Sequence, residues 1–261
     1  YTFLRCEQEY AYKYLWQAAK GSPTGANAAD PLVRGTLLHV GVAHVHVRQR
    51  ARQRDEDPDR YHDPVTAMRL VADEYGDRGQ DMLPKLLAAL EAYKERYADE
   101  GNVEVLHVEE PFDITIRLPN GSLYTYTQTP DLIWRDRRSQ LCWIDDLKTT
   151  SRLTPQTITS YSPSVQMVSY RILGPMLFGQ KFGGVRIRAV CWTDSTFQVS
   201  ALEPAPGLVR AFPETIQYVE DRIAEYEKLG TPLSSYRKAS NDLVCYHKYG
   251  PCDYLRTCLW G

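Results

Sequence analysis

The feature that most constrains the fold is a change of hydrophobic periodicity near residue 100. Before it, apolar residues recur at helical spacing, and after it they alternate with polar residues as in strands with one buried face. The predicted helices are 5–19, Pro31 to the low fifties, 65–76, 81–98, 154–178 and 213–228. Pro163 and Gly174-Pro175 are candidate interruptions of the helix 154–178. The predicted strands are 103–118, 122–127, 131–135, 141–147, 185–193 and 196–202, with a hairpin turn at Asn120-Gly121. This order predicts an α/β (α+β) fold with a mixed central sheet flanked by helices, after an N-terminal helical region.

Size and charge limit the class of protein. A chain of 261 residues can form one large domain, and we expect a helical part at 1–100, a sheet core at 101–210 and a C-terminal helix with an irregular tail at 211–261. The net charge of −2 gives no global signal for a polyanion, so any nucleic-acid surface must be local. Neither a membrane span nor a signal peptide is evident, so we expect a cytoplasmic protein that does not bind a membrane.

Two acidic residues and a lysine lie on neighbouring predicted strands. Asp146 and Lys148 are two residues apart, so the alternation of a strand places both on one face, and Asp131 opens an adjacent strand. Carboxylates bind Mg²⁺ or Mn²⁺ through hard oxygen ligands, and an ammonium group can stabilise charge on a phosphate. A surface ion pair is the alternative interpretation. The apolar residues around Asp146 favour a ligand, because a buried carboxylate is costly unless it binds something.

The segments Pro130-Asp131 and Ile144-Asp145-Asp146-Leu147-Lys148-Thr149 resemble the acidic motifs of the PD-(D/E)xK nucleases. The closest resemblance is to the RecB-like branch, which includes AddB-type and CRISPR-adaptation exonucleases and many phage nucleases. It implies a restriction-endonuclease-like core with Asp131, Asp146 and Lys148 at the catalytic centre. The family register makes Asp146 the metal ligand, whereas Asp145 points to the other face and is expected to be structural.

Three looser motifs match the same branch. A Gly-x-x-x-His motif ending at His39 implies a metal ligand, although packing in a helix interface is the simpler interpretation of His39 alone. A Glu-x-Pro-Phe motif implies an acidic catalytic residue and metal ligand, which we assign to Glu109 because Glu110 lies on the apolar face of its strand. Gln166 and Tyr170, four residues apart on a helix, imply contact with DNA. By themselves they would fit a half-buried helix face.

The cysteines fall into two groups. Cys142 and Cys191 lie in apolar strand-like runs and are predicted to be small buried hydrophobic residues. The four others lie near the ends of the chain: Cys6, Cys245, Cys252 and Cys258. In iron–sulfur members of the branch, one N-terminal and three C-terminal cysteines bind a [4Fe–4S] cluster, and the resemblance implies the same here. Zn²⁺ and four ordinary reduced cysteines are the alternatives. The longer gap before Cys252 departs from the family pattern.

The motifs together predict a Mg²⁺- or Mn²⁺-dependent DNA nuclease. The resemblance implies an exonuclease that favours single-stranded DNA ends, with a helicase or recombination protein as a partner. The chain carries no Walker-type phosphate loop of its own. The alternatives are a non-catalytic DNA-binding or scaffold module on the same fold, and a redox iron–sulfur protein. Arginines near residues 48–54, 135–138 and 186–188 could follow phosphates or form solvated charged faces.

Overall fold

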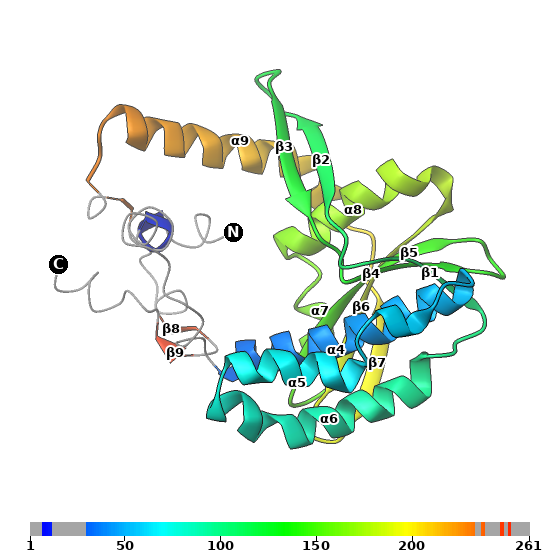
Figure 1. The fold of residues 1–261 in the computed structure, drawn as a ribbon. Coiled ribbons are helices and arrows are strands. Elements are labelled where there is room, and N and C mark those ends of the chain that lie inside the picture. The colour runs from blue at the N-terminus through cyan, green and yellow to red at the C-terminus, as the bar shows by residue number, and fades with distance from the viewer. Residues whose placement is uncertain (1–6, 12–29, 233–235, 238–245, 248–249, 252–261) are drawn as a thin grey trace. The chain divides into compact units, whose positions relative to one another are not determined.

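The computed structural model describes residues 7–11, 30–232, 236–237, 246–247 and 250–251 (Figure 1). It divides into two compact units. The larger unit contains residues 30–116 and 124–210, and it includes the main sheet and the helices that pack on it. The smaller unit contains the described parts of 1–29, 117–123 and 211–261. No helix among the described residues combines the length and the apolar character that a membrane crossing requires.

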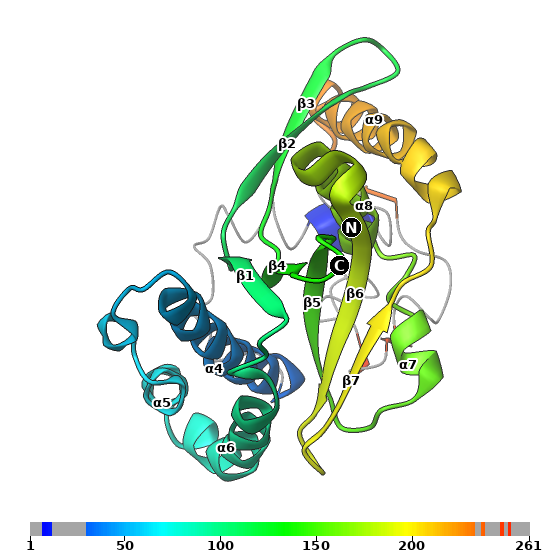
Figure 2. The ribbon, with the colours of Figure 1, turned by 90° about the vertical axis from the view of Figure 1, so that its right-hand side faces the viewer.

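Three helices form one layer of the larger unit: α4 (Asp30–Gln53), α5 (Pro64–Glu74) and α6 (Asp77–Tyr97). A short 3-10 helix, η3 (Pro58–Arg60), lies between α4 and α5. The side chain of Asp63 caps α5 by accepting hydrogen bonds from the next backbone amides, and Pro64 occupies the first turn. Figure 2 shows the three helices side by side on one side of the sheet. The predicted helices in this region are confirmed to within a few residues at each end.

The main sheet has the strand order β1-β4-β5-β6-β7. Its strands are β1 (Val103–Val108), β4 (Leu132–Asp136), β5 (Cys142–Thr150), β6 (Phe182–Cys191) and β7 (Thr196–Ala201). Only β5 and β6 pair in parallel within this sheet; the other pairs are antiparallel. A parallel pair needs a crossover, and helices α7 (Pro155–Thr159) and α8 (Val165–Phe178) provide it. The sheet is therefore mixed, and the predicted α/β class is confirmed.

The two faces of the sheet are buried under different helices. On one face, Ile133, Ile144 and Ile187 pack with Met167 and Tyr170 of α8. The opposite face packs against α4: the residues in contact are Val103, Val105, Val108, Leu132 and Trp134 of the sheet with Ala43 and Val47 of the helix. Burial on both faces explains why the central strands read as nearly continuous apolar runs.

The predicted single strand at 103–118 is wrong, because the chain leaves the main sheet after Val108. Glu109 has a φ of 50°, a left-handed conformation, and the chain then turns at Pro111. Strand β2 (Phe112–Arg117) continues into a separate hairpin with β3 (Leu123–Gln128). Its turn contains the predicted Asn120-Gly121, and Gly121 has a φ of 86°. The hairpin thus begins just after Glu109 and ends just before Asp131, which brings it to the candidate site.

Two of the predicted helices have different bounds in the structure. Pro163 lies in the break between α7 and α8, so the predicted helix 154–178 is interrupted there, whereas Pro175 lies inside α8. Helix α9 (Pro206–Lys228) begins earlier than predicted and includes Pro213. The described part of the smaller unit also contains α2 (Glu7–Tyr10), β8 (Tyr246–His247) and β9 (Gly250–Pro251). Within that unit, the ring of Tyr226 stacks on Tyr236 at 4.1 Å.

Candidate metal centre

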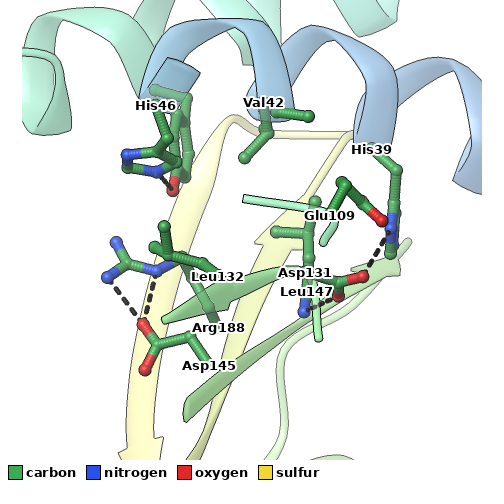
Figure 3. A pocket seen from close by; sticks show the side chains of 11 residues that line it. His39, Val42, His46, Glu109, Asp131, Leu132, Asp145, Leu147 and Arg188 are labelled. Carbon is green, nitrogen blue, oxygen red and sulfur yellow. Dashed lines mark hydrogen bonds and ion pairs between the residues drawn. The ribbon is translucent and has the colours of Figure 1, made fainter. Parts of the chain in front are cut away.

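Three elements of the larger unit bring an imidazole and two carboxylates together (Figure 3). His39 comes from α4, Glu109 follows β1 and Asp131 precedes β4. One potential ligand atom from each residue lies within 4.8 Å of the others. The Nδ1 atom of His39 is 3.5 Å from Oδ1 of Asp131. The helix interface suggested for His39 alone therefore does not describe its position, because its ring faces the two carboxylates.

The backbone fixes Asp131 and Glu109 in this arrangement. The amide of Leu147 on β5 donates a hydrogen bond to Oδ2 of Asp131 at 2.5 Å. The amide of Glu109 donates to the carbonyl oxygen of Asp131 at 3.2 Å. A non-glycine residue in the left-handed region costs about 1–3 kcal/mol, and such strain is concentrated at functional sites. The strained conformation of Glu109 thus coincides with the point where its carboxylate meets Asp131.

The neighbouring glutamate is engaged elsewhere. Glu110 forms an ion pair with Arg50, and its Oε2 atom lies 2.5 Å from Nδ1 of His107. These partners lower the pKa of Glu110 although burial opposes the shift. Glu110 is therefore a structural ion-pair residue, and the choice of Glu109 as the candidate ligand agrees with the geometry.

Asp146 and Lys148 lie on β5 and form an ion pair. Asp146 is fully buried, and Nζ of the half-buried Lys148 lies 2.5 Å from its Oδ2 atom. The other carboxylate oxygen, Oδ1, has no hydrogen-bond partner among the described residues. Buried polar atoms are rarely left in this state, so Oδ1 indicates a group that binds a further ligand.

The pKa shifts of the acidic residues show that negative charges repel one another at this centre. Burial and the charge of Asp131 raise the pKa of Glu109 to about 7. Burial raises the pKa of Asp146 to about 6, with Lys148 opposing and Asp131 reinforcing the shift. Burial alone would lower the pKa of His39, but the three carboxylates raise it. Carboxylates that raise one another's pKa values form a site that a cation would stabilise.

The donor set fits a divalent metal ion. His39, Glu109 and Asp131 could hold it directly, and buried Asp146, which is ion-paired through Oδ2 alone, supplies a further acidic group beside Asp131. Carboxylate oxygens with one imidazole suit Mg²⁺ or Mn²⁺ better than the soft metals that thiolates select. The centre is thus a possible divalent-metal site.

A chain of hydrogen bonds connects Lys148 to the segment before Asp131. Nζ of Lys148 donates to Oε1 of Gln166 at 3.3 Å, and Nε2 of Gln166 donates to the hydroxyl of Tyr170 at 3.0 Å. That hydroxyl donates to the carbonyl oxygen of Thr129 at 3.2 Å. The predicted DNA contact of Tyr170 does not fit this geometry, because Tyr170 is fully buried. We assign Tyr170 a positioning role, whereas half-buried Gln166 reaches the site through Lys148.

Sequence reasoning missed one aromatic residue at the site. Nζ of Lys148 lies 5.3 Å from the ring centroid of Tyr161, within range of a cation–π contact. Tyr161 lies in the break between α7 and α8, where no periodic pattern marks it. Only the return of the chain after β5 brings it to Lys148, so the sequence contained no signal for this contact.

Asp145 lies on the opposite face of β5 from Asp146, as expected. Its carboxylate accepts hydrogen bonds from Arg186 at 2.7 Å, Arg188 at 2.9 Å and the indole of Trp134 at 3.0 Å. Burial alone would raise the pKa of Asp145, but the two arginines lower it to about 2. Arg186 and Arg188 are therefore partners of Asp145, and the suggestion that they follow DNA phosphates is wrong for this conformation.

A second histidine near the site has a purely internal role. His46 is fully buried, and its ring nitrogens lie 2.7 Å from the hydroxyl of Tyr93 and 3.0 Å from Gln49. Burial and the charge of Arg188 lower the pKa of His46 to about 4, so its ring is neutral at physiological pH. His46 and Asp145 line the same small cavity, of about 10 Å³, as His39 and Asp131 (Figure 3).

The cysteine predictions have different outcomes. Cys142 and Cys191 are buried, as predicted for small hydrophobic residues. The four terminal cysteines, predicted to bind a [4Fe–4S] cluster or Zn²⁺, lie outside the described residues: Cys6, Cys245, Cys252 and Cys258. Their role stays a prediction.

Comparisons with known proteins bear on the family. No curated protein matches the chain. Among solved structures, the crystal structure of SSO0001 matches with 14% sequence identity over 72% of this chain and 84% of that chain. The TM-score of this match is 0.35. The sequence profile of the PD-(D/E)XK nuclease superfamily, in contrast, matches residues 1–259. The chain therefore belongs to the PD-(D/E)XK nuclease superfamily.

Proposed function

We propose that this protein is a metal-dependent deoxyribonuclease that hydrolyses phosphodiester bonds at the candidate metal centre. One observation carries the proposal: His39, Glu109 and Asp131 converge beside the ion pair of buried Asp146 and half-buried Lys148 in a member of a nuclease superfamily. A stability role alone does not explain a buried carboxylate whose Oδ1 atom lacks a hydrogen-bond partner among the described residues, next to two further carboxylates.

Each group has a proposed task. His39, Glu109, Asp131 and Asp146 hold Mg²⁺ or Mn²⁺, which when bound activates water and neutralises charge on the phosphate. Lys148 is positioned to donate a hydrogen bond from Nζ to the attacking water or to a phosphate oxygen. The ion pair with Asp146, the Gln166 side chain and the Tyr161 ring restrain its ammonium group.

We further propose that the substrate is single-stranded DNA or a DNA end, cut as by an exonuclease. Several arginines that could contact a duplex backbone are paired within the protein: Arg48 with Asp59, Arg50 with Glu110 and Arg52 with Asp99. The net charge of −2 gives no broad attraction for a DNA backbone of either form, so the preference for single strands follows from the family resemblance. The RecB-like assignment, the iron–sulfur cluster and a helicase or recombination partner remain predictions from sequence resemblance.

The decisive experiment compares linear single-stranded, linear duplex and circular single-stranded DNA with Mg²⁺, Mn²⁺ or excess chelator. We expect metal-dependent loss of the linear single strand and survival of the circle. Asp146→Asn should reduce cutting by at least about 100-fold, a typical cost of losing a catalytic group. Asp81→Asn is the matched control, because Asp81 is an exposed carboxylate on α6. Cutting that survives chelation, or that Asp146→Asn leaves intact, would disprove the proposal.

The same assay tests the alternative of a non-catalytic DNA-binding module. Such a module would bind the labelled strands with similar affinity whether or not Asp146 is replaced, and would release no fragments under any metal condition. Loss of a circular substrate together with the linear one would instead identify an endonuclease.

A further inference from the structure

Helix α4 contains two glycines, and the structure explains only one of them. A glycine inside a helix costs about 1 kcal/mol relative to alanine. At Gly41 a Cβ atom would approach the side-chain ends of Met68 and Leu90 to 2.8 and 2.9 Å, so close packing against α5 and α6 favours glycine. At Gly35 a Cβ atom would meet nothing within 4 Å, and the backbone is not left-handed. Neither backbone conformation nor packing in the described part of the chain accounts for Gly35.

Gly35 lies in a groove of about 540 Å³ along α4. The groove is continuous with the candidate metal centre, because His39 and Glu109 line both. Around Gly35 its walls include Leu32, Thr36 and Val40 of α4. Its volume falls within the roughly 300–1,000 Å³ that is common for small-ligand sites.

The chemistry of the groove indicates a neutral, largely apolar ligand. Among its described lining residues there is no lysine or arginine, so it does not suit a phosphate group. Leucine and valine side chains form part of its wall around Gly35, and Leu32 is 64% exposed there. In a DNA strand, the neutral and partly apolar moiety next to a phosphate is the nucleoside.

We propose that this groove binds one unpaired nucleoside, base and sugar, directly beside the phosphate that is cut, and that Gly35 is glycine so that the nucleoside can lie against the helix. The inference rests on the proposed nuclease function. A base in this groove has to leave its stack, which is easiest at a single-stranded end. The groove would therefore contribute to a preference for unpaired ends.

The test adds bulk at Gly35. In Gly35→Leu the new side chain enters the groove without backbone strain, and the helix gains propensity, so the melting temperature should not fall. Gly207→Leu is the matched control: Gly207 is an exposed glycine of α9 whose Cβ would also meet nothing within 4 Å. We compare kcat/KM of the wild type and both variants on a single strand and on the same strand with one abasic residue. The abasic residue is placed in turn on either side of the scissile bond.

For the wild type and Gly207→Leu, we expect an abasic residue on one side to lower kcat/KM by about 10-fold or more, the scale of one lost base–protein contact. In Gly35→Leu the intact strand should be cut as slowly as the abasic strand, so that the difference disappears. If Gly35→Leu leaves the difference between intact and abasic strands unchanged, the groove does not bind the nucleoside. If the groove instead binds a protein partner, the DNA kinetics would not depend on Gly35, and the difference between intact and abasic strands would also be unchanged.

Binding separates failure of this proposal from failure of the proposed function. Anisotropy of a fluorescein-labelled single strand, measured without divalent ions, reports affinity even if the protein never cuts. Loss of affinity in Gly35→Leu but not in Gly207→Leu would support the groove as a nucleoside site in a non-cutting protein. Equal affinity in both variants, with cutting intact, would overturn the groove and leave the nuclease proposal in place.

Discussion

Asp145→Asn replaces the buried carboxylate behind the metal centre by an amide of similar size. Asp145 is 1% exposed and accepts hydrogen bonds from Trp134, Arg186 and Arg188. The substitution leaves two guanidinium groups without their anion, one of them on a side chain only 4% exposed. It also turns the amide nitrogen, a donor, toward other donors. Both effects destabilise the folded state, and neither occurs in the unfolded chain.

The magnitude follows from the geometry. Removing one partner of a buried ion pair costs about 3–5 kcal/mol. The melting temperature of a domain of this size falls by about 2–4 °C for each kcal/mol. We therefore expect a decrease of roughly 6–20 °C, measured by calorimetry at neutral pH in chelator so that metal binding does not contribute.

The neighbouring Asp146→Asn variant is the control for this experiment. Asp146 is equally buried, but burial raises its pKa to about 6, so its charge opposes folding at neutral pH. We expect its melting temperature in chelator to stay level or rise. The two adjacent substitutions should thus have opposite effects on stability.

The pH dependence gives a second test of the same reasoning. The pKa of Asp145 is lowered from 3.8 to about 2, so its ionised form is favoured in the folded state. The corresponding stability of about 2 kcal/mol is present above pH 4 and is lost as the pH falls toward 2. Asp145→Asn should lack this component of acid denaturation. A variant that melts within about 2 °C of the wild type would refute the ion-pair argument.

Three further predictions concern the site and the cysteines. Lys148→Ala should lower kcat by about 100-fold or more, while its Mn²⁺ affinity, measured by calorimetric titration, stays within a few-fold of the wild type. A normal kcat would contradict the proposed role of Lys148. Mn²⁺ affinity should rise as the pH increases through about 7, where Glu109 loses its proton, and Glu109→Gln should weaken binding and flatten this dependence. Protein purified without oxygen should be brown, with iron and acid-labile sulfide in elemental analysis, and Cys258→Ala should remove the colour. Zinc without acid-labile sulfide would indicate a zinc site in place of the cluster, and a colourless, metal-free and stable protein would exclude both kinds of site.

Local patterns were sufficient to predict part of this protein. Alternation along β5 placed Asp146 and Lys148 on one face and Asp145 on the other, because side chains of a strand alternate whatever the strand packs against. The Asn120-Gly121 turn and the presence of helices α4, α5 and α6 were likewise predicted, from turn residues and from apolar spacing.

Only the tertiary structure decided which distant residues meet. Alternation distinguished Glu109 from Glu110 only by the face of the strand, whereas the left-handed turn at Glu109 directs one carboxylate to Asp131 and the other to Arg50. The same turn divides the predicted strand 103–118 between two sheets. The burial of Tyr170 depends likewise on how α8 packs against the sheet. Such contacts join segments that are far apart in the chain, and periodicity describes only the side of an element on which a residue lies, not what that side packs against.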